Sequence, residues 1–160
     1  MSKSVLFVCL GNICRSPAAE GIFLRIVKEA GLDTQIIVDS AGTGGWHVGD
    51  GPDNRMIHHA AQRGYDLRAL EARQLKWPDD YKKFDYILTM DNSNLKNVRA
   101  LDPNGEHHAK IRPLTSFCRI HEIEEVPDPY YKEDEGFEHV LDLLEDACTE
   151  LLAHIRKDLK

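Results

Sequence analysis

The chain has 160 residues and a formal net charge of −7, with 42% hydrophobic and 29% charged residues, which is typical of a folded globular domain. We expect one domain over residues 1–160, because single hydrophobic cores are commonest at roughly 100 to 200 residues. The acidic balance disfavours a general nucleic-acid binder. No apolar run approaches the ~18 residues of a membrane helix, and residues 1–4 lead into a short apolar strand instead of a signal peptide, so we expect a cytoplasmic protein without membrane contact.

Strands and helices alternate along the sequence. The continuous apolar run 5–8 predicts a central strand, and Ser16-Pro17 predicts the N-cap and first turn of a helix that ends at Gly31. Glu20 adds a favourable charge near the positive end of that helix. There follow a strand at 36–38, a helix at 54–62, a strand at 86–88, a helix capped by Asp91, a weaker strand at 111–114 and a C-terminal helix with apolar positions from Phe137 to Ile155.

This alternation predicts an α/β fold, an open parallel sheet with helices on both faces and right-handed crossovers. In such sheets ligands bind beyond the carboxyl ends of the strands, where the winding direction reverses. For a flavodoxin-like strand order that point lies beside the first strand. The loop after Val8 is therefore the first place to look for chemistry.

That loop is suited to binding an oxyanion. It runs from Cys9 to Pro17 and ends at a helix N-terminus, where unpaired backbone N–H groups carry a partial positive charge. Gly11 permits close backbone approach and Asn12 tolerates positive φ, so the loop can curl tightly. Arg15 adds a planar fork of donors that can hold two phosphoryl oxygens. The candidate phosphate-binding residues are Leu10, Gly11, Asn12, Ile13, Cys14 and Ser16.

Cys9 faces the same cradle from the strand end. Surrounding N–H dipoles, Arg15 and the Ser16 hydroxyl favour a thiolate, which would make Cys9 a nucleophile at neutral pH. Without this context a cysteine at a strand end is most often a small core residue. The loop is not a nucleotide-binding Gly-Lys-Ser/Thr loop, because no lysine follows a glycine here, and residues 42–45 do not complete a dinucleotide fingerprint.

At these residues the sequence resembles the low-molecular-weight protein tyrosine phosphatases. The resemblance covers nearly the whole chain and rests on two motifs, Cys9 to Ser16 near the N-terminus and Asp128-Pro129-Tyr130-Tyr131 ahead of the last helix. It implies a flavodoxin-like fold with a four-stranded parallel sheet, hydrolysis of aryl phosphates without metal or other cofactor, and a phosphocysteine intermediate. Phosphotyrosine-containing proteins would be the partners, with a tyrosine kinase among them.

The resemblance also implies roles for individual residues. Cys9 would attack phosphorus, Arg15 would clamp the phosphate, and Asp128 would act as general acid and then general base. Trp46, Tyr130 and Tyr131 would wall the substrate pocket. Cys14 matches the second cysteine of the family and could capture oxidised Cys9 as a reversible disulfide. Ser40 and Asp91 match supporting positions.

One position departs from the family pattern. Many members carry a histidine that braces the loop asparagine, where this chain has Leu70. Asn12 could therefore lose a hydrogen bond, which would leave the loop held in another way or the cysteine less activated.

Two other functions stay open. An arsenate reductase-like redox enzyme would need further cysteines after the central helices, and residues 74–97 contain none. A non-catalytic phosphopeptide sensor would not need Cys9, Arg15 and Asp128 together. The adjacent pairs His58-His59 and His107-His108 are expected on the solvated surface, because neighbours in sequence do not have the i, i+4 spacing of helical metal ligands. The oligomeric state and the physiological substrate are not readable from the sequence.

Overall fold

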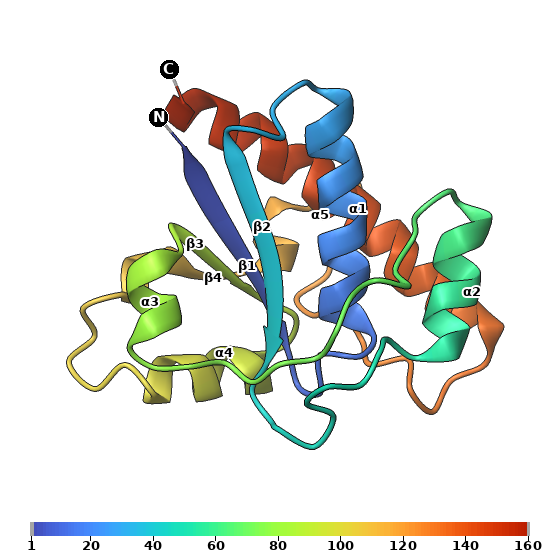
Figure 1. Cartoon of the computed structure of the whole chain (residues 1–160), viewed down its shortest axis with the longest axis horizontal. Coiled ribbons are helices and arrows are strands. Elements are labelled where there is room, and N and C mark those ends of the chain that lie inside the picture. The colour runs from blue at the N-terminus through green and yellow to red at the C-terminus, as the bar shows by residue number, and fades with distance from the viewer. Residues whose placement is uncertain (1, 160) are drawn as a thin grey trace.

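The computed structural model describes residues 2–159, which form a parallel sheet with helices on both faces (Figure 1). The four strands lie in the order β2-β1-β3-β4. Their bounds are β1 Lys3–Cys9, β2 Ile36–Gly42, β3 Tyr86–Thr89 and β4 Ile111–Pro113. Central β1 pairs in parallel with both neighbours, so that Val5 lies opposite Val38 on one side and Tyr86 on the other. The predicted flavodoxin-like α/β fold is confirmed.

Helices α1 and α5 cover one face of the sheet, and α3 and α4 lie on the other (Figure 1). Side chains alternate between the faces of a strand, so Val5 and Phe7 of β1 join the α1 and α5 core, while Leu6 and Val8 pack with α3 and α4. Both faces of β1 are therefore buried, as its continuous apolar run predicts. The bounds are α1 Arg15–Glu29, α2 Asn54–Gln62, α3 Asp79–Lys83, α4 Asn92–Ala100, η1 His108–Lys110, η2 Leu114–Phe117 and α5 Asp134–Leu159.

Two details of the first helix differ from the prediction. Helix α1 begins at Arg15, and its N-cap is Cys14, whose side chain makes no capping bond. Ser16 is inside the helix and fully buried, so it is not the N-cap. Glu20 is also buried and bonds to Ser40, so it does not serve as an exposed charge at the helix start.

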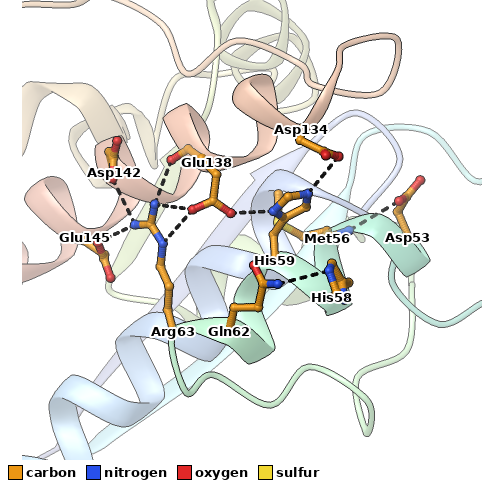
Figure 2. A network of polar contacts seen from close by, with 10 residues as sticks. All are labelled: Asp53, Met56, His58, His59, Gln62, Arg63, Asp134, Glu138, Asp142 and Glu145. Atoms are coloured by element: carbon orange, nitrogen blue, oxygen red, sulfur yellow. Dashed lines mark hydrogen bonds and ion pairs between the residues drawn. The ribbon is translucent and has the colours of Figure 1, made fainter.

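A polar network joins α2 to α5 (Figure 2). Arg63 contacts three carboxylates on successive turns of α5, those of Glu138, Asp142 and Glu145, at 2.7, 3.0 and 2.7 Å. His59 is buried and stacks on Phe137, with its Nδ1 2.5 Å from a Glu138 oxygen. The prediction that the histidine pairs lie on the solvated surface is therefore wrong for His59. The network fixes α2, whose first turn borders the loop after β1.

None of the helices within residues 2–159 is long and apolar enough to cross a membrane.

Candidate active site

A cavity of about 240 Å³ opens beyond the carboxyl end of β1, at the place where the winding of the sheet reverses. It collects the two motifs that the sequence singles out, although they are separated by more than a hundred residues. Its lining consists of Cys9, Leu10, Gly11, Ile13, Cys14, Arg15, Trp46, His47, Asp128, Tyr130 and Tyr131.

The Cys9 sulfur lies at the base of this cavity and is surrounded by donors. Its Sγ is 2.9 Å from the Ser16 hydroxyl and accepts the Asn12 backbone N–H at 3.3 Å. Cys9 ends the central strand and pairs with Gly42 of β2, while the pairing of β1 with β3 ends one residue earlier, at Val8. Neutral hydrogen-bond donors and a guanidinium are the kinds of groups that a cysteine nucleophile needs around its sulfur.

The loop leaves a group of backbone donors free. Within residues 2–159 no protein acceptor faces the N–H groups of Ile13, Cys14 or Arg15. The curl depends on Asn12, whose φ of 58° is a left-handed value that asparagine tolerates better than most residues. These orphan donors and the helix start above them make a nest for an oxyanion.

Arg15 is held rigidly beside this nest. Its side chain is only 3% exposed, and Nη1 donates to Asp91 at 2.7 Å and to the Val126 carbonyl at 3.0 Å. Within residues 2–159, Nε and Nη2 have no hydrogen-bond partner, and Nη2 is 3.8 Å from an Asp128 oxygen. Interactions with Cys9 and Asp91 raise the pKa of Arg15 against the opposing effect of burial, so the guanidinium stays charged. One edge is therefore anchored to protein, and the other is left for a ligand.

Asp91 both orients Arg15 and caps α4. Its carboxylate accepts the Asn94 backbone N–H at 2.8 Å, and the Asn94 side chain accepts the Asp91 N–H in return, which completes a capping box. The predicted cap is thus confirmed, and the same side chain lies in the site.

Asn12 has hydrogen-bond partners although this chain has Leu70 where many family members carry a histidine. The Arg73 backbone N–H donates to Asn12 Oδ1 at 3.0 Å. The Asn12 amide nitrogen donates to the hydroxyls of Ser16 and Ser40, at 2.8 and 2.9 Å. The loop is therefore braced by a backbone group close to Leu70 in sequence.

Asp128 and the two tyrosines form the opposite wall. Asp128 is partly exposed, and its carboxylate accepts the Tyr130 backbone N–H at 3.1 Å. The Arg55 guanidinium carbon lies 5.3 Å from the centroid of the Tyr130 ring. Tyr131 is 93% exposed and Trp46 is 73% exposed. Trp46 and Tyr131 thus stand at the mouth of the cavity, where they can contact a substrate without being fixed by the core.

Asp53 and Arg55 contact the site, but the sequence did not predict them as site residues. The Asp53 backbone N–H donates to the Ile13 carbonyl at 2.7 Å, and its side chain caps α2 and pairs with Arg55. The pair therefore links the loop after β1 to Tyr130. An acidic N-cap two residues before an arginine is a visible signal, but the sequence alone does not show what the pair touches.

The remaining cysteines, Cys14, Cys118 and Cys148, are free thiols. Burial, with Asp53 and Cys9 nearby, raises the pKa of Cys14, and burial raises that of Cys118 to about 12. Burial also raises the pKa of Cys148. Within residues 2–159 no three His, Cys, Asp or Glu side chains are grouped to hold a metal ion.

The fold and the cavity together define a class, an α/β protein that presents a cysteine and an arginine to an oxyanion. A family model described as low molecular weight phosphotyrosine protein phosphatase matches residues 4–160, and the chain belongs to this family, whose members are cysteine-dependent protein tyrosine phosphatases.

Individual relatives are similar in sequence to this chain over nearly their full length. The Synechocystis protein slr0328 is 50% identical over 155 residues, which cover 97% of this chain and 98% of that protein. The low molecular weight protein-tyrosine-phosphatase of Streptomyces coelicolor is 41% identical and covers 100% of this chain and 98% of its own. The crystal structure of a protein tyrosine phosphatase from Entamoeba histolytica has a TM-score of 0.94 at 40% identity, over 99% of this chain and 100% of that chain.

Proposed function

We propose that this protein hydrolyses phosphotyrosine and other aryl phosphate monoesters through a phosphocysteine intermediate. One observation carries the proposal: Cys9 Sγ, the free edge of Arg15 and the unpaired N–H groups of the loop lie around one cavity. A phosphate in that cavity would meet a nucleophile and its charge-stabilising donors at the same time.

In the first step the Cys9 thiolate attacks phosphorus in line with the ester oxygen. The S–P bond forms while the P–O bond to the phenol breaks, and Asp128 gives its proton to the departing oxygen. Arg15 and the loop N–H groups bind the three equatorial oxygens, whose charge is redistributed in the transition state. The products are the phenol and phosphorylated Cys9.

In the second step water attacks phosphocysteine. Asp128, now a carboxylate, accepts a proton from the water as the new P–O bond forms and the S–P bond breaks. Inorganic phosphate leaves and Cys9 is again a thiolate. Both steps need only charged and polar groups of the chain.

The mouth of the cavity favours an aromatic ring. Trp46, Tyr130 and Tyr131 line it, so a phenyl ring would lie between apolar walls while its phosphate reaches Cys9. The shorter phosphoserine side chain would place phosphorus farther from the sulfur. Phosphotyrosine-containing proteins, a tyrosine kinase among them, are therefore the proposed partners, in the cytoplasm.

Hydrolysis of p-nitrophenyl phosphate tests this function. We expect wild type to turn over equally with and without a chelator, and Cys9→Ser to bind phosphate without turnover. Retained turnover in Cys9→Ser would overturn the nucleophile. Phosphate binding without hydrolysis by wild type would instead support the sensor.

A further inference from the structure

Glu20 is a buried acid on α1 that the proposed mechanism does not use. It is 8% exposed, and its Oε1 accepts the Ser40 hydroxyl at 2.6 Å, a length typical of a hydroxyl bonded to a carboxylate. Burial raises its pKa to about 7; Ser40 and Arg73 oppose the rise, and Asp39 adds to it. Glu20 is thus an acceptor whose charge changes around neutral pH.

Asn12 determines the direction of the hydrogen bonds behind the catalytic loop. The Arg73 backbone N–H can only donate, so the Asn12 atom that faces it at 3.0 Å is the carbonyl oxygen. The amide nitrogen then faces the hydroxyls of Ser16 and Ser40, at 2.8 and 2.9 Å, and donates to both. Each serine oxygen accepts from Asn12, so each hydroxyl proton must find another acceptor.

The two ends of this network are Glu20 and Cys9. Ser40 donates its proton to the Glu20 carboxyl, and Ser16 is left to donate to Cys9 Sγ at 2.9 Å. Every donor between the acid and the nucleophile therefore has one acceptor. Without an acceptor at Glu20, the buried Ser40 hydroxyl would compete for other partners and loosen the Asn12 amide.

We propose that Glu20 is a positioning residue for the phosphoryl-transfer reaction, acting through Ser40, Asn12 and Ser16 on the Cys9 sulfur. The inference rests on the proposed phosphatase function and assigns a role within that same site. Glu20 touches neither the substrate nor the sulfur. Its carboxyl group keeps the Asn12 amide oriented and leaves the Ser16 hydroxyl for Cys9.

The charge of Glu20 has a second, opposing effect. In the proposed reaction the other end of the network carries an anionic nucleophile and an anionic phosphate. The charged groups that act on Glu20 are Asp39 on β2 and Arg73 in the segment after α2. At ~10 Å and an effective dielectric constant of ~20, ionised Glu20 would disfavour an anion in the cavity by about tenfold. Neutral Glu20 supplies the acceptor without this repulsion.

Two substitutions separate the acceptor from the charge. Glu20→Gln keeps an oxygen for Ser40 and removes the charge, so its kcat/KM for p-nitrophenyl phosphate should match wild type within about threefold near pH 5.5 and exceed it by about tenfold near pH 8. Glu29→Gln on the same helix, whose side chain is 66% exposed, is the matched control and should follow wild type at both values. Identical behaviour of Glu20→Gln and wild type at both pH values would overturn the charge effect.

A double-mutant cycle separates positioning from mere structural support. Near pH 5.5, where the charge effect is small, Glu20→Met removes the acceptor and should lower kcat/KM by about tenfold in the wild-type background. In a Ser40→Ala background the same change should cost less than about twofold, because Glu20 acts through that hydroxyl. Equal losses in both backgrounds would overturn the proposal. If Glu20→Met does not fold, the same cycle with Glu20→Ala, which also removes the acceptor, decides the matter.

Binding of inorganic phosphate, measured by calorimetry, makes the test independent of turnover. Glu20→Gln should bind phosphate about as tightly as wild type near pH 5.5 and about tenfold more tightly near pH 8. If wild type hydrolyses no aryl phosphate, the proposed function fails, and the calorimetry still tests the coupling of Glu20 to the cavity. Equal affinities at both pH values would contradict the charge effect of Glu20 even in an active phosphatase.

Discussion

Replacing Arg15 by lysine keeps the positive charge but removes the fork of donors. In the structure Nη1 is committed to Asp91 and to the Val126 carbonyl, which leaves Nε and Nη2 for the substrate. A lysine has one nitrogen for both tasks. If it stays with Asp91, two donors to phosphoryl oxygens are lost, and the loss of one oxyanion donor typically costs about 10²–10³-fold in kcat.

We therefore expect Arg15→Lys to lower kcat for p-nitrophenyl phosphate by about 10³-fold, with the remaining charge preventing the full cost of two donors. The Val126 carbonyl also loses a buried, charge-assisted bond, so the free energy of unfolding should fall by about 1.5–3 kcal/mol. Steady-state kinetics and urea denaturation measure the two effects. A variant that keeps kcat within about tenfold of wild type would refute the argument that geometry, and not charge alone, is what Arg15 provides.

Three further predictions follow from the site and its surroundings. Asp128→Asn should lower kcat most for aryl phosphates with poor leaving groups, by about 10²-fold or more, because such groups need the proton. Cys14→Ser should turn reversible inactivation by peroxide into irreversible loss, because the sulfenic acid of Cys9 can then no longer condense with the Cys14 thiol to a disulfide and water. Arg63→Met should lower Tm by about 4 °C near neutral pH. Arg63 holds the pKa of Glu138 below its usual range, so this contribution is present at neutral pH and is lost as the pH falls through the folded-state pKa.

Each has a result that would contradict it. Equal losses on good and poor leaving groups would remove Asp128 from proton transfer. Full recovery of peroxide-treated Cys14→Ser after addition of a thiol would show that Cys14 gives no protection. A Tm difference for Arg63→Met that stays constant as the solution is acidified would mean that the α2–α5 ion pairs do not stabilise the fold.

The strands and the place of the site could be predicted because local signals carry them, whereas the order of the strands was implied only by the resemblance to the family. The apolar run 5–8 indicates a strand buried on both faces, and a loop that joins such a strand to a helix start lies by topology at a ligand site. The pairing of β1 with β2 and β3 then places Cys9 where the sequence predicts it. The short helix α3 has no apolar periodicity of its own and was not predicted.

The parts that could not be predicted depend on contacts between distant segments. The Val126 carbonyl meets Arg15 across 111 residues, and the Arg73 N–H meets Asn12 across 61. Backbone groups have no signature in the sequence, so neither contact could be read there. Glu20 carries a partial signal, because it lies four residues after Ser16 on the same helix face, but its burial depends on β2 and Ser40.

The central claim is that phosphate passes through a covalent bond to Cys9. Acid quenching of wild type during turnover of p-nitrophenyl phosphate, followed by mass spectrometry of its peptides, tests this most directly. We predict a phosphoryl group on Cys9 that is absent from Cys9→Ser. Active wild-type enzyme that carries its phosphoryl group on another residue would contradict the account.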